Sequence, residues 1–369
     1  MRSLHLFYPE NDLALARDLD NYTPPPAASR LRKSGETLAL WYGDDGDKVF
    51  TQGINSQWYK SIKERFGLRT ELYDGNPDGL RPAPWGWSKA SRTFFRRLGF
   101  PEDILPDDSR LARMRELSHR RTAAEIDAAL CRELPFAVAQ PAEELNSFSE
   151  VEEFVVRNGS AVLKLPWSSS GRGLLFASPA DTGHLRPTVE GVIRRQGSIM
   201  GERRYRRILD FAMLFTMDAG KCTYDGLSLF NTDNNGAYTG NVLAPQHELH
   251  DIISASAGDI DAVAAALTSI LENIIGTAYD GPLGVDMMAI DDGDVRLAPA
   301  VELNLRMTMG HVCRIIYQGR IADGAHGVFS VGEPTLASDT AVIKDQRLTA
   351  GTLTLSSPGT PFSFRISLQ

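Results

Sequence analysis

The hydrophobic positions in the first third of the chain predict strands that alternate with helices. Short apolar runs at Leu4–Tyr8, Thr37–Tyr42 and Thr70–Tyr73 are typical of buried strands, and Gln57–Phe66 has the spacing of a helix. Strands and helices in alternation indicate a parallel α/β sheet. We therefore expect a small parallel α/β domain at residues 1–108.

The middle of the chain predicts a second domain, at residues 109–200. One helix is expected over 110–133, where charged residues and alanines have helical spacing. A strand is expected at Ala161–Leu165, after a helix at Ser149–Asn158. This mixture favours α+β rather than regularly alternating structure.

The last part of the chain predicts a third domain, at residues 201–369, that opens with longer strands. Its clearest element is the helix Ile260–Ile275, whose apolar residues recur every three or four positions. Asp259 is placed to cap the start of this helix and Gly276 its end. The spacing indicates a core helix without chemistry of its own.

The composition is that of a globular protein and excludes several function classes. Hydrophobic residues make up 42% and charged residues 23% of the 369 positions. A net charge of −8 argues against general nucleic-acid binding, which needs a basic surface. No apolar stretch is predicted to reach the ~18 residues of a membrane helix, and the three cysteines match no metal or redox motif. We expect a cytoplasmic protein with no nucleic-acid or membrane partner.

A lysine at the end of an apolar strand is the first candidate for chemistry. Lys164 follows Ala-Val-Leu, and its ammonium is costly to bury without an anionic partner. In the segment Ser168–Gly173, which follows closely, glycines let backbone N–H groups face an anion and serines add hydroxyl donors. This combination is typical of phosphate binding. A surface hairpin with a solvated lysine is the alternative.

Acidic and amide side chains near residue 300 are the second candidate. Glu302, Asn304 and Arg306 share one face if their strand extends that far. Carboxylate and amide oxygens suit Mg²⁺, which often also binds substrate phosphates. Asp286 lies on the preceding predicted strand and could complete the set. An amphipathic hairpin with a polar outer face is the alternative.

The metal hypothesis depends on how these two strands pair. A two-residue turn would pair Asp286 with Pro299 and place Asp286 on the face opposite to Glu302. A three-residue loop or a bulge would instead align Asp286 with Ala300 and Glu302. The hypothesis therefore predicts a specific hairpin geometry.

A short apolar strand that ends at an acid is the third candidate. The segment Ser198–Glu202 could bind adenine through its backbone edge and its terminal acid. Asp210 could bind the ribose hydroxyls. The arginines at 203–207 could meet an anionic substrate or product. A solvated charged loop explains these arginines at least as well.

Together, the three segments resemble the ATP-grasp superfamily, of the carboxylate–amine or carboxylate–thiol ligase type. In that superfamily a strand lysine precedes a glycine-rich loop over the phosphates, and an apolar strand ending in an acid lines the adenine pocket. A late Asp/Glu…Glu-x-Asn-x-Arg stretch binds Mg²⁺ and the transferring phosphoryl group. The resemblance covers Ser118–Val312, roughly half of the chain. It implies an ATP-grasp fold preceded by the small parallel α/β domain.

The resemblance also implies residue roles. Catalysis would involve Lys164 and Arg306, and Mg²⁺, or alternatively Mn²⁺, would be bound by Asp286, Glu302 and Asn304. The residues expected to bind ATP are Arg120, Arg121, Lys164, Ser168, Ser169, Ser170, Gly171, Arg172, Gly173, Met200, Glu202 and Asp210.

One departure from the superfamily concerns an early phosphate-binding lysine. The matching stretch here is Ser-His-Arg-Arg-Thr, at residues 118–122. Arginine also neutralises phosphate, although with a different geometry. The sequence does not decide between Arg120 and Arg121, and both could simply lie on a helix surface.

The implied activity is a ligase that converts ATP to ADP and phosphate. A small-molecule carboxylate would be activated as an acyl phosphate and attacked by an amine, which forms an amide or peptide bond. Amino acids and peptides are both open as substrates. A small-molecule kinase of the same fold and a non-catalytic nucleotide-binding regulator are the alternatives. A homodimer is the default expectation.

Two loops and one histidine are candidates for a supporting role. Tyr8–Asp12 leaves the carboxyl end of the first strand, where open α/β sheets bind ligands. Asn231–Asn241 is polar and carries Tyr238, although a plain hairpin turn is the alternative. His311 follows the predicted Mg²⁺ stretch and could support its ligands.

Overall fold

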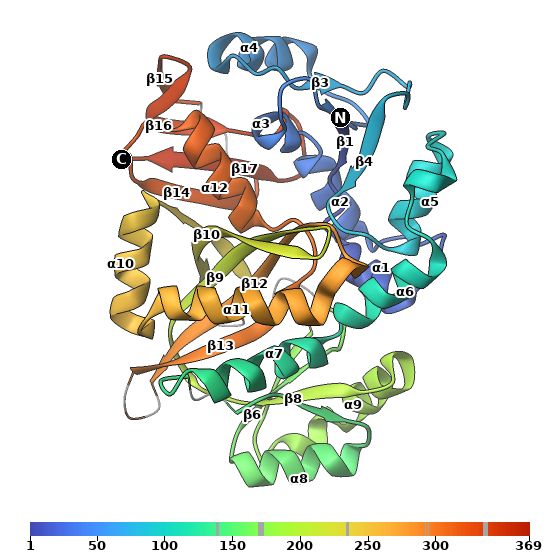
Figure 1. The fold of residues 1–369 in the computed structure, drawn as a ribbon, viewed down its shortest axis with the longest axis vertical. Helices are drawn as coiled ribbons and strands as arrows, with labels where there is room; N and C mark the ends of the chain where they lie inside the picture. Colours follow the sequence, from blue (N-terminus) through green and yellow to red (C-terminus); the bar gives the residue numbers. More distant parts are fainter. Residues whose placement is uncertain (138–139, 169–172, 234–235, 292, 294, 335–338) are drawn as a thin grey trace.

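The strands of the protein form three sheets, which Figure 1 shows in the upper part, the middle and the lower lobe of the molecule. The computed structural model describes all residues except 138–139, 169–172, 234–235, 292, 294 and 335–338. One sheet is parallel and the other two are antiparallel. The predicted class, α/β with α+β nucleotide-binding parts, is confirmed.

The N-terminal sheet has the strand order β3-β2-β1-β4 and is parallel throughout. Its strands are β1 (Arg2–Leu6), β2 (Lys48–Val49), β3 (Glu71–Leu72) and β4 (Leu80–Pro84). Its helices are α1 (Asn11–Arg17), α2 (Pro26–Gly35), α3 (Ala39–Tyr42), α4 (Ser56–Phe66) and α5 (Lys89–Arg97), followed by the 3-10 turn η1 (Glu102–Ile104). This is the small parallel α/β unit that the sequence predicts.

The predicted strand at Thr37–Tyr42 is wrong, because helix α3 lies there. Leu38, Leu40 and Trp41 are all buried, so no face of this segment is polar. A short run that is apolar on every side gives no periodicity with which to tell a helix from a strand. The Trp41 indole donates a hydrogen bond of 2.9 Å to the Leu355 carbonyl, far along the chain.

The other four-stranded sheet is antiparallel, has the order β5-β8-β6-β7 and forms the lower lobe in Figure 1. Its elements are β5 (Glu143–Leu145), α8 (Phe148–Asn158), β6 (Ala161–Lys164), β7 (Leu174–Ala177), α9 (Thr182–Gln196) and β8 (Ile199–Arg203). The lobe has its own hydrophobic cluster. Strand β8 runs across the boundary predicted at residue 200, and the domain limits remain a prediction.

The largest sheet has the order β13-β12-β9-β10-β11-β14-β17-β16-β15. Its strands are β9 (Arg206–Asp218), β10 (Lys221–Thr232), β11 (Tyr238–Leu243), β12 (Gly281–Asp291), β13 (Val295–Asn304), β14 (Gly327–Gly332), β15 (Val342–Lys344), β16 (Arg347–Thr354) and β17 (Ser363–Leu368). The helices that cover it are α6 (Asp108–Leu117), α7 (Arg120–Glu133), α10 (Gln246–Ala257), α11 (Ile260–Ile275), followed by the turn η2 (Gly276–Ala278), and α12 (Met309–Arg320).

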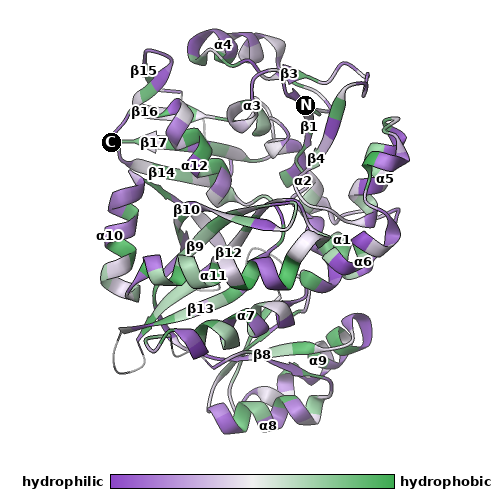
Figure 2. Ribbon diagram, viewed as in Figure 1, coloured by the Kyte–Doolittle hydropathy of each residue, from purple (hydrophilic) through white to green (hydrophobic). Residues whose placement is uncertain are grey.

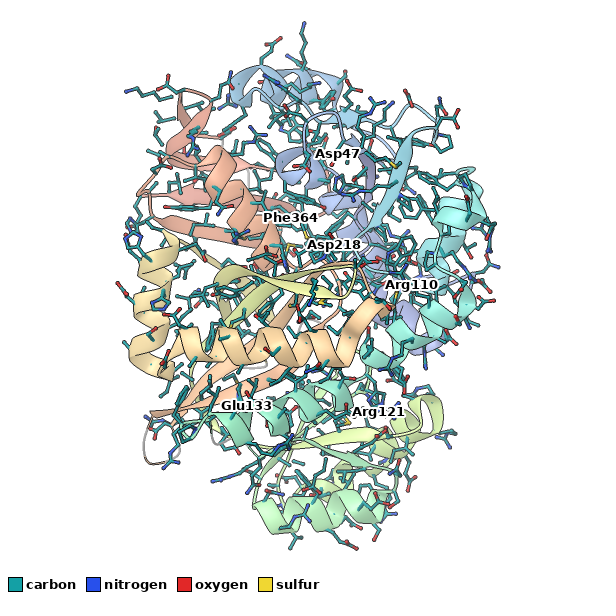
Figure 3. The ribbon with its side chains drawn as sticks, in the orientation of Figure 1. Asp47, Arg110, Arg121, Glu133, Asp218 and Phe364 are labelled. Carbon is teal, nitrogen blue, oxygen red and sulfur yellow. The ribbon has the colours of Figure 1, made fainter. Side chains whose placement is uncertain are left out.

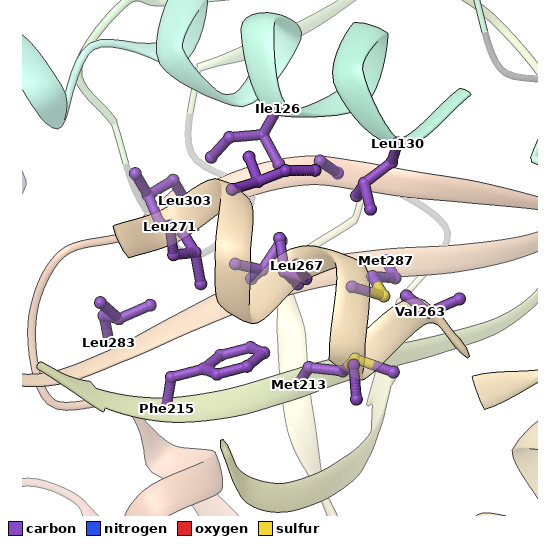
Figure 4. Packing of buried hydrophobic residues seen from close by; sticks show 14 of the residues in the cluster. Ile126, Leu130, Met213, Phe215, Val263, Leu267, Leu271, Leu283, Met287 and Leu303 are labelled. Atoms are coloured by element: carbon purple, nitrogen blue, oxygen red, sulfur yellow. The ribbon is translucent and has the colours of Figure 1, made fainter. Parts of the chain in front are cut away.

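Helix α11 packs on the central strands, and its predicted bounds are confirmed. Figure 4 shows Leu267 and Leu271 above Phe215, and all three are fully buried. In Figure 2, α11 carries both hydrophobic and hydrophilic residues, as a helix with one buried face should. By length and composition alone, Ile260–Ala278 could also cross a membrane, contrary to the sequence prediction. A buried core helix passes the same test, so this is weak evidence.

The helix predicted over 110–133 is in fact two helices, α6 and α7, that break at Ser118 and His119. The ring of His119 accepts a hydrogen bond of 3.1 Å from the Arg121 backbone N–H and so caps the start of α7. As a result Arg120 lies at a helix N-terminus, a position that favours anions.

Candidate active site

Lys164 is the last residue of β6 and is buried beside acidic groups from neighbouring elements. Its ammonium forms an ion pair with Glu202 on the adjacent strand β8. It also influences the carboxyls of Asp127 and Asp210 electrostatically. A buried ammonium needs anionic partners. The lysine predicted to bind phosphate thus has one ion-pair partner, Glu202, and two further acidic side chains in its neighbourhood.

The structure separates the two arginines that the sequence could not. Arg120 is buried, and its guanidinium lies 3.0 Å from a Glu302 carboxylate oxygen. The same side chain donates hydrogen bonds to the carbonyls of Leu165, at 3.1 Å, and Ser168, at 3.3 Å. Arg120 therefore connects the predicted phosphate loop to the predicted metal strand.

Arg121 points elsewhere. Figure 3 shows it where α7 meets the lower lobe. Its guanidinium lies 3.5 Å from Glu144 of β5, and 43% of its side chain is exposed. The structure thus brings Arg120, and not Arg121, to the other predicted site residues.

Strands β12 and β13 pair in the register that the metal hypothesis requires. Asp291 is opposite Val295, and a bulge follows before Asp286 comes opposite Glu302. Without the bulge, the same hairpin would place Asp286 opposite Ala300. Directly paired residues project from the same face of a sheet, so the two carboxylates face one site. The predicted alignment is confirmed, while the metal role remains a prediction.

The side chains at this face fit a magnesium ion. Burial and the neighbouring Glu302 raise the pKa of Asp286, whereas Arg306 and a hydrogen bond from Asn304 oppose the rise. Two carboxylates that repel one another would be stabilised by a divalent cation between them. The described residues include no group of three His, Cys, Asp or Glu side chains that could hold a metal. Two carboxylates and an amide suit Mg²⁺, which fills its shell with water and phosphate oxygens.

Arg306 lies beyond the end of β13, so the strand alone does not orient it. Its Nε donates a hydrogen bond of 2.9 Å to Asp12, and its Nη1 donates one of 3.2 Å to the Met307 carbonyl. Among the described residues, none accepts a hydrogen bond from Nη2. Burial would lower the pKa of Arg306, but Asp12 and Glu302 raise it above its usual value. The guanidinium therefore stays charged, with one nitrogen left for an anionic ligand.

The loop after β1 packs tightly against Arg306. A Cβ added at Gly86 would lie 2.5 Å from the Asn11 amide nitrogen and 3.0 Å from the Arg306 Cβ. Asn11 is almost fully buried, and its Oδ1 has no hydrogen-bond partner among the described residues. The predicted substrate loop, Tyr8–Asp12, thus reaches the metal strand. Its contact with a substrate remains a prediction.

A cavity that opens to solvent lies between α7, β13 and the end of β8, and its space including the open mouth is about 380 Å³. Arg120, Asp127, Glu202, Tyr205 and Ala300 are among the residues that line it. It adjoins the buried Lys164–Glu202 ion pair, where the sequence predicts the nucleotide.

Asp127 also lines the cavity, and the sequence analysis did not name it as a candidate. Burial raises its pKa to about 7, although a hydrogen bond from the Ala300 backbone opposes the rise. An available signal was its position, because Ala123, Ile126 and Leu130 predict a buried helix face that Asp127 shares. A carboxyl on an apolar helix face needs an explanation.

The remaining predicted ATP-binding residues lie at different distances from the cavity. Met200 is fully buried opposite Lys164 in the sheet and does not line the cavity. Asp210 is buried, accepts a hydrogen bond of 2.7 Å from Thr232, and has its pKa raised by burial. Ser168 is buried and contacts Arg120 through its carbonyl. The other predicted loop residues, Ser169, Ser170, Gly171 and Arg172, lie outside the described residues.

Gly173 closes that loop in a conformation that favours glycine. Its φ is +84°, and a Cβ there would lie 2.9 Å from the Leu165 side chain. The glycine therefore allows the chain to return to β7 close against β6, where Lys164 ends its strand.

The supporting candidates have structural partners. His311 is buried, with Nδ1 2.9 Å from the Thr308 hydroxyl, and burial lowers its pKa to about 4. Tyr238 donates a hydrogen bond of 2.5 Å to Asn241, which in turn donates one of 2.6 Å to Ser228. These contacts stabilise the sheet face beside the site.

Comparison of the fold with known proteins relates it to ATP-grasp enzymes. No family model matches the sequence, and neither does any curated protein. Biotin carboxylase from Campylobacter jejuni, solved as a βγ-ATP complex, aligns over 100% of this chain and 88% of its own, with 10% identity and a TM-score of 0.52. Pyruvate carboxylase from Rhizobium etli, solved with acetyl coenzyme-A, aligns over 100% of this chain and 36% of its own, with 13% identity and a TM-score of 0.55.

At these low sequence identities, the comparisons show a similarity of fold alone. The enzymes compared are members of the ATP-grasp superfamily. Their arrangement matches the mixed α/β structure described above, with one parallel and two antiparallel sheets. The chain therefore has the ATP-grasp fold, as the resemblance in its sequence predicted.

Proposed function

We propose that the protein is an ATP- and Mg²⁺-dependent ligase that joins a small-molecule carboxylate to an amine. One observation carries the proposal: Arg306, held by Asp12, lies beside the facing carboxylates Asp286 and Glu302. A site that only bound nucleotide would not need a charged guanidinium oriented beside metal ligands. Such a group suits the stabilisation of charge that develops on a phosphoryl group during transfer.

The proposed roles follow from the contacts. Lys164 and Arg120 would bind phosphate oxygens in place of Glu202 and Glu302, their present partners. Once released from Arg120, Glu302 would be free to bind Mg²⁺ together with Asp286 and Asn304. In this reaction, ATP would supply the phosphoryl group, and Mg²⁺ would neutralise its negative charge.

Arg306 would bind the carboxylate that is phosphorylated or the phosphoryl oxygens, through its free Nη2. Asp12 would keep the guanidinium in place. The loop at residues 168–173 would cover the phosphates and exclude water, so that the acyl phosphate reacts with an amine rather than being hydrolysed. No side chain needs to form a covalent intermediate.

The experiment is a screen for substrate-dependent ATP turnover. The protein with Mg²⁺-ATP would be incubated with pools of amino acids, peptides and carboxylates, and ADP and phosphate release measured. Hydroxylamine would trap an acyl phosphate as a hydroxamate. We expect turnover only when a carboxylate is present, and an amide product when an amine is added.

Two variants test the residue roles. Glu302→Gln should abolish Mg²⁺-dependent turnover without unfolding the protein, and unchanged turnover would contradict the metal assignment. Lys164→Ala should weaken ATP binding measured by calorimetry, and an affinity equal to that of the wild type would remove Lys164 from the site.

The two alternatives predict different products. A kinase of the same fold would release a stable phosphorylated compound and no amide. A regulatory nucleotide-binding protein would bind ATP but release no ADP with any pool. The oriented Arg306 favours catalysis over regulation. The cytoplasmic location, the homodimer and the substrates remain predictions.

A further inference from the structure

A second cavity lies between α10, α12, the middle of β10 and the end of β11; it opens to solvent, and its space including the open mouth is about 240 Å³. Ser228, Asn241, Gln246, Cys313 and Arg314 are among the residues that line it. It shares no lining residue with the cavity beside Lys164. The proposed reaction makes no use of it.

Arg314 is unusual among the partly buried arginines of the protein. Its Nε is inaccessible to solvent and has no hydrogen-bond partner, and no described residue forms an ion pair with its guanidinium. The Nε of the buried Arg92 also lacks a partner, but Arg92 is ion-paired through Nη1 with Asp108, at 2.7 Å, and the buried Arg120 is ion-paired with Glu302, at 3.0 Å. Arg314 is only partly buried, so the cost concerns its Nε–H, a donor that is shielded from water and has no acceptor.

The acidic residues nearest to this cavity along the chain have other partners. Asp225 accepts a hydrogen bond of 2.7 Å from Thr216, and Glu248 lies 2.6 Å from His326. Neither of these acidic residues forms an ion pair with Arg314, which has no close anionic partner within the described part of the protein.

The cavity exists because β10 and β11 separate. Their pairing covers only Phe230–Thr232 of β10, so the backbone at Leu227 has no strand partner from β11. The Gln246 side chain takes this place, accepting a hydrogen bond of 2.7 Å from the Leu227 N–H and donating one of 3.0 Å to its carbonyl. The gap is thus held open by specific contacts.

Arg314 lies directly over this gap. The bulge residue Gly226 has a φ of +137°, and a Cβ there would lie 2.5 Å from Gln246 Oε1 and 3.0 Å from Arg314 Nε. A glycine without a side chain lets the guanidinium approach the sheet. The register places Gly226 and Ser228 on the same face as Leu214, Ala212 and hence Asp286.

We propose that this cavity is a binding site for the carboxylate or phosphate group of a small anionic ligand, held by Arg314. Carboxylate and phosphate are the anions that a guanidinium fork matches best. Besides their bonds to Asn241 and Leu227, the Ser228 hydroxyl and the second amide N–H of Gln246 can each still donate a hydrogen bond inside the cavity. Ser228 is two strands from Asp286, a separation of about 10 Å at the usual strand spacing. The site does not depend on the proposed ligase activity.

The test measures anion binding with the nucleotide site filled. Inorganic phosphate and succinate would each be titrated into the protein saturated with Mg²⁺ and a non-hydrolysable ATP analogue, at constant ionic strength, by calorimetry and thermal unfolding. We expect binding of at least one probe and a higher Tm in its presence. Arg314→Met should weaken that binding about tenfold or more, as the loss of a charged hydrogen-bonding partner does.

Two variants separate a ligand site from a structural role. Arg320→Met removes a charge from the same helix, where Arg320 already donates to the Phe66 carbonyl, and should leave anion binding unchanged. Arg314→Lys keeps the charge and should retain part of the affinity. Without an anion, Arg314→Met should be at least as stable as the wild type, because it removes an unpaired buried donor.

The outcomes are distinct. Equal anion affinity in the wild type and Arg314→Met, or no binding of either probe, would overturn the proposal. A higher KM for one substrate in Arg314→Met would identify the anion as part of that substrate. Unchanged kinetic constants with lost probe binding would identify a separate ligand of the same chemistry.

Discussion

Replacement of Asp127 by asparagine should make the stability of the protein less dependent on pH. Burial raises the pKa of this carboxyl from 3.8 to about 7 in the folded state. The folded protein therefore holds this proton more tightly than the unfolded chain does. The resulting stability is complete below the unfolded pKa and is lost as the pH rises through the folded pKa.

The magnitude follows from the size of the shift. One pKa unit corresponds to about 1.4 kcal/mol, so the full shift of roughly three units would cost about 4 kcal/mol at pH 8. Between pH 5 and pH 8 the wild type should lose about 3 kcal/mol through this group alone. Asparagine is uncharged and keeps an oxygen to accept the Ala300 N–H. The Asp127→Asn variant should therefore lose this part of the slope.

The assay is urea unfolding at several pH values between 5 and 8 for both proteins. Subtracting the two profiles removes the contributions of all other titrating groups. Glu125→Gln is the matched control, because Glu125 is exposed on the same helix, and its profile should follow the wild type. Parallel profiles for the wild type and Asp127→Asn, or a variant that is less stable at pH 8, would refute the reasoning.

Three further changes test other contacts. Asp12→Asn should lower kcat about tenfold or more while ATP affinity stays constant, because it loosens Arg306 but not the phosphate contacts; an equal change in both would contradict a positioning role. Gly86→Ala should cost about 1–3 kcal/mol in urea unfolding, since the added methyl group would overlap Asn11. Leu267→Ala should cost about 2–5 kcal/mol by the same measurement, and a cost below 1 kcal/mol would contradict its central place in the core.

Sequence reasoning succeeded where one local pattern decides the structure. Helix α11 has an uninterrupted apolar stripe between Asp259, whose side chain accepts the Ala262 N–H at 3.0 Å, and Gly276. The hairpin of β12 and β13 has two strands joined by a short turn, so its register was reduced to a few alternatives. In both cases the contacts that determine the geometry are close in sequence.

Sequence reasoning failed where contacts between segments far apart in the chain determine the structure. Helix α3 is apolar on every side because the C-terminal strands cover it. The residues near Trp41 in the sequence do not predict its hydrogen bond to Leu355. The break between α6 and α7 depends on a histidine cap, and histidine is not among the usual capping residues. Asp127 lies among the apolar residues Ala123, Ile126 and Leu130 on the buried face of α7.

The N-terminal part of the protein completes the site and cannot be considered apart from the rest. Asp12 is 294 positions from Arg306, and their hydrogen bond is made only when β1 and the end of β13 are brought together. The two regions also share one hydrophobic cluster, in which Leu4 and Trp41 pack with residues such as Phe364. Folding of this cluster therefore determines where Arg306 lies. A change that disturbs the shared core at Leu4 or Trp41 should reduce the proposed catalysis by displacing Arg306.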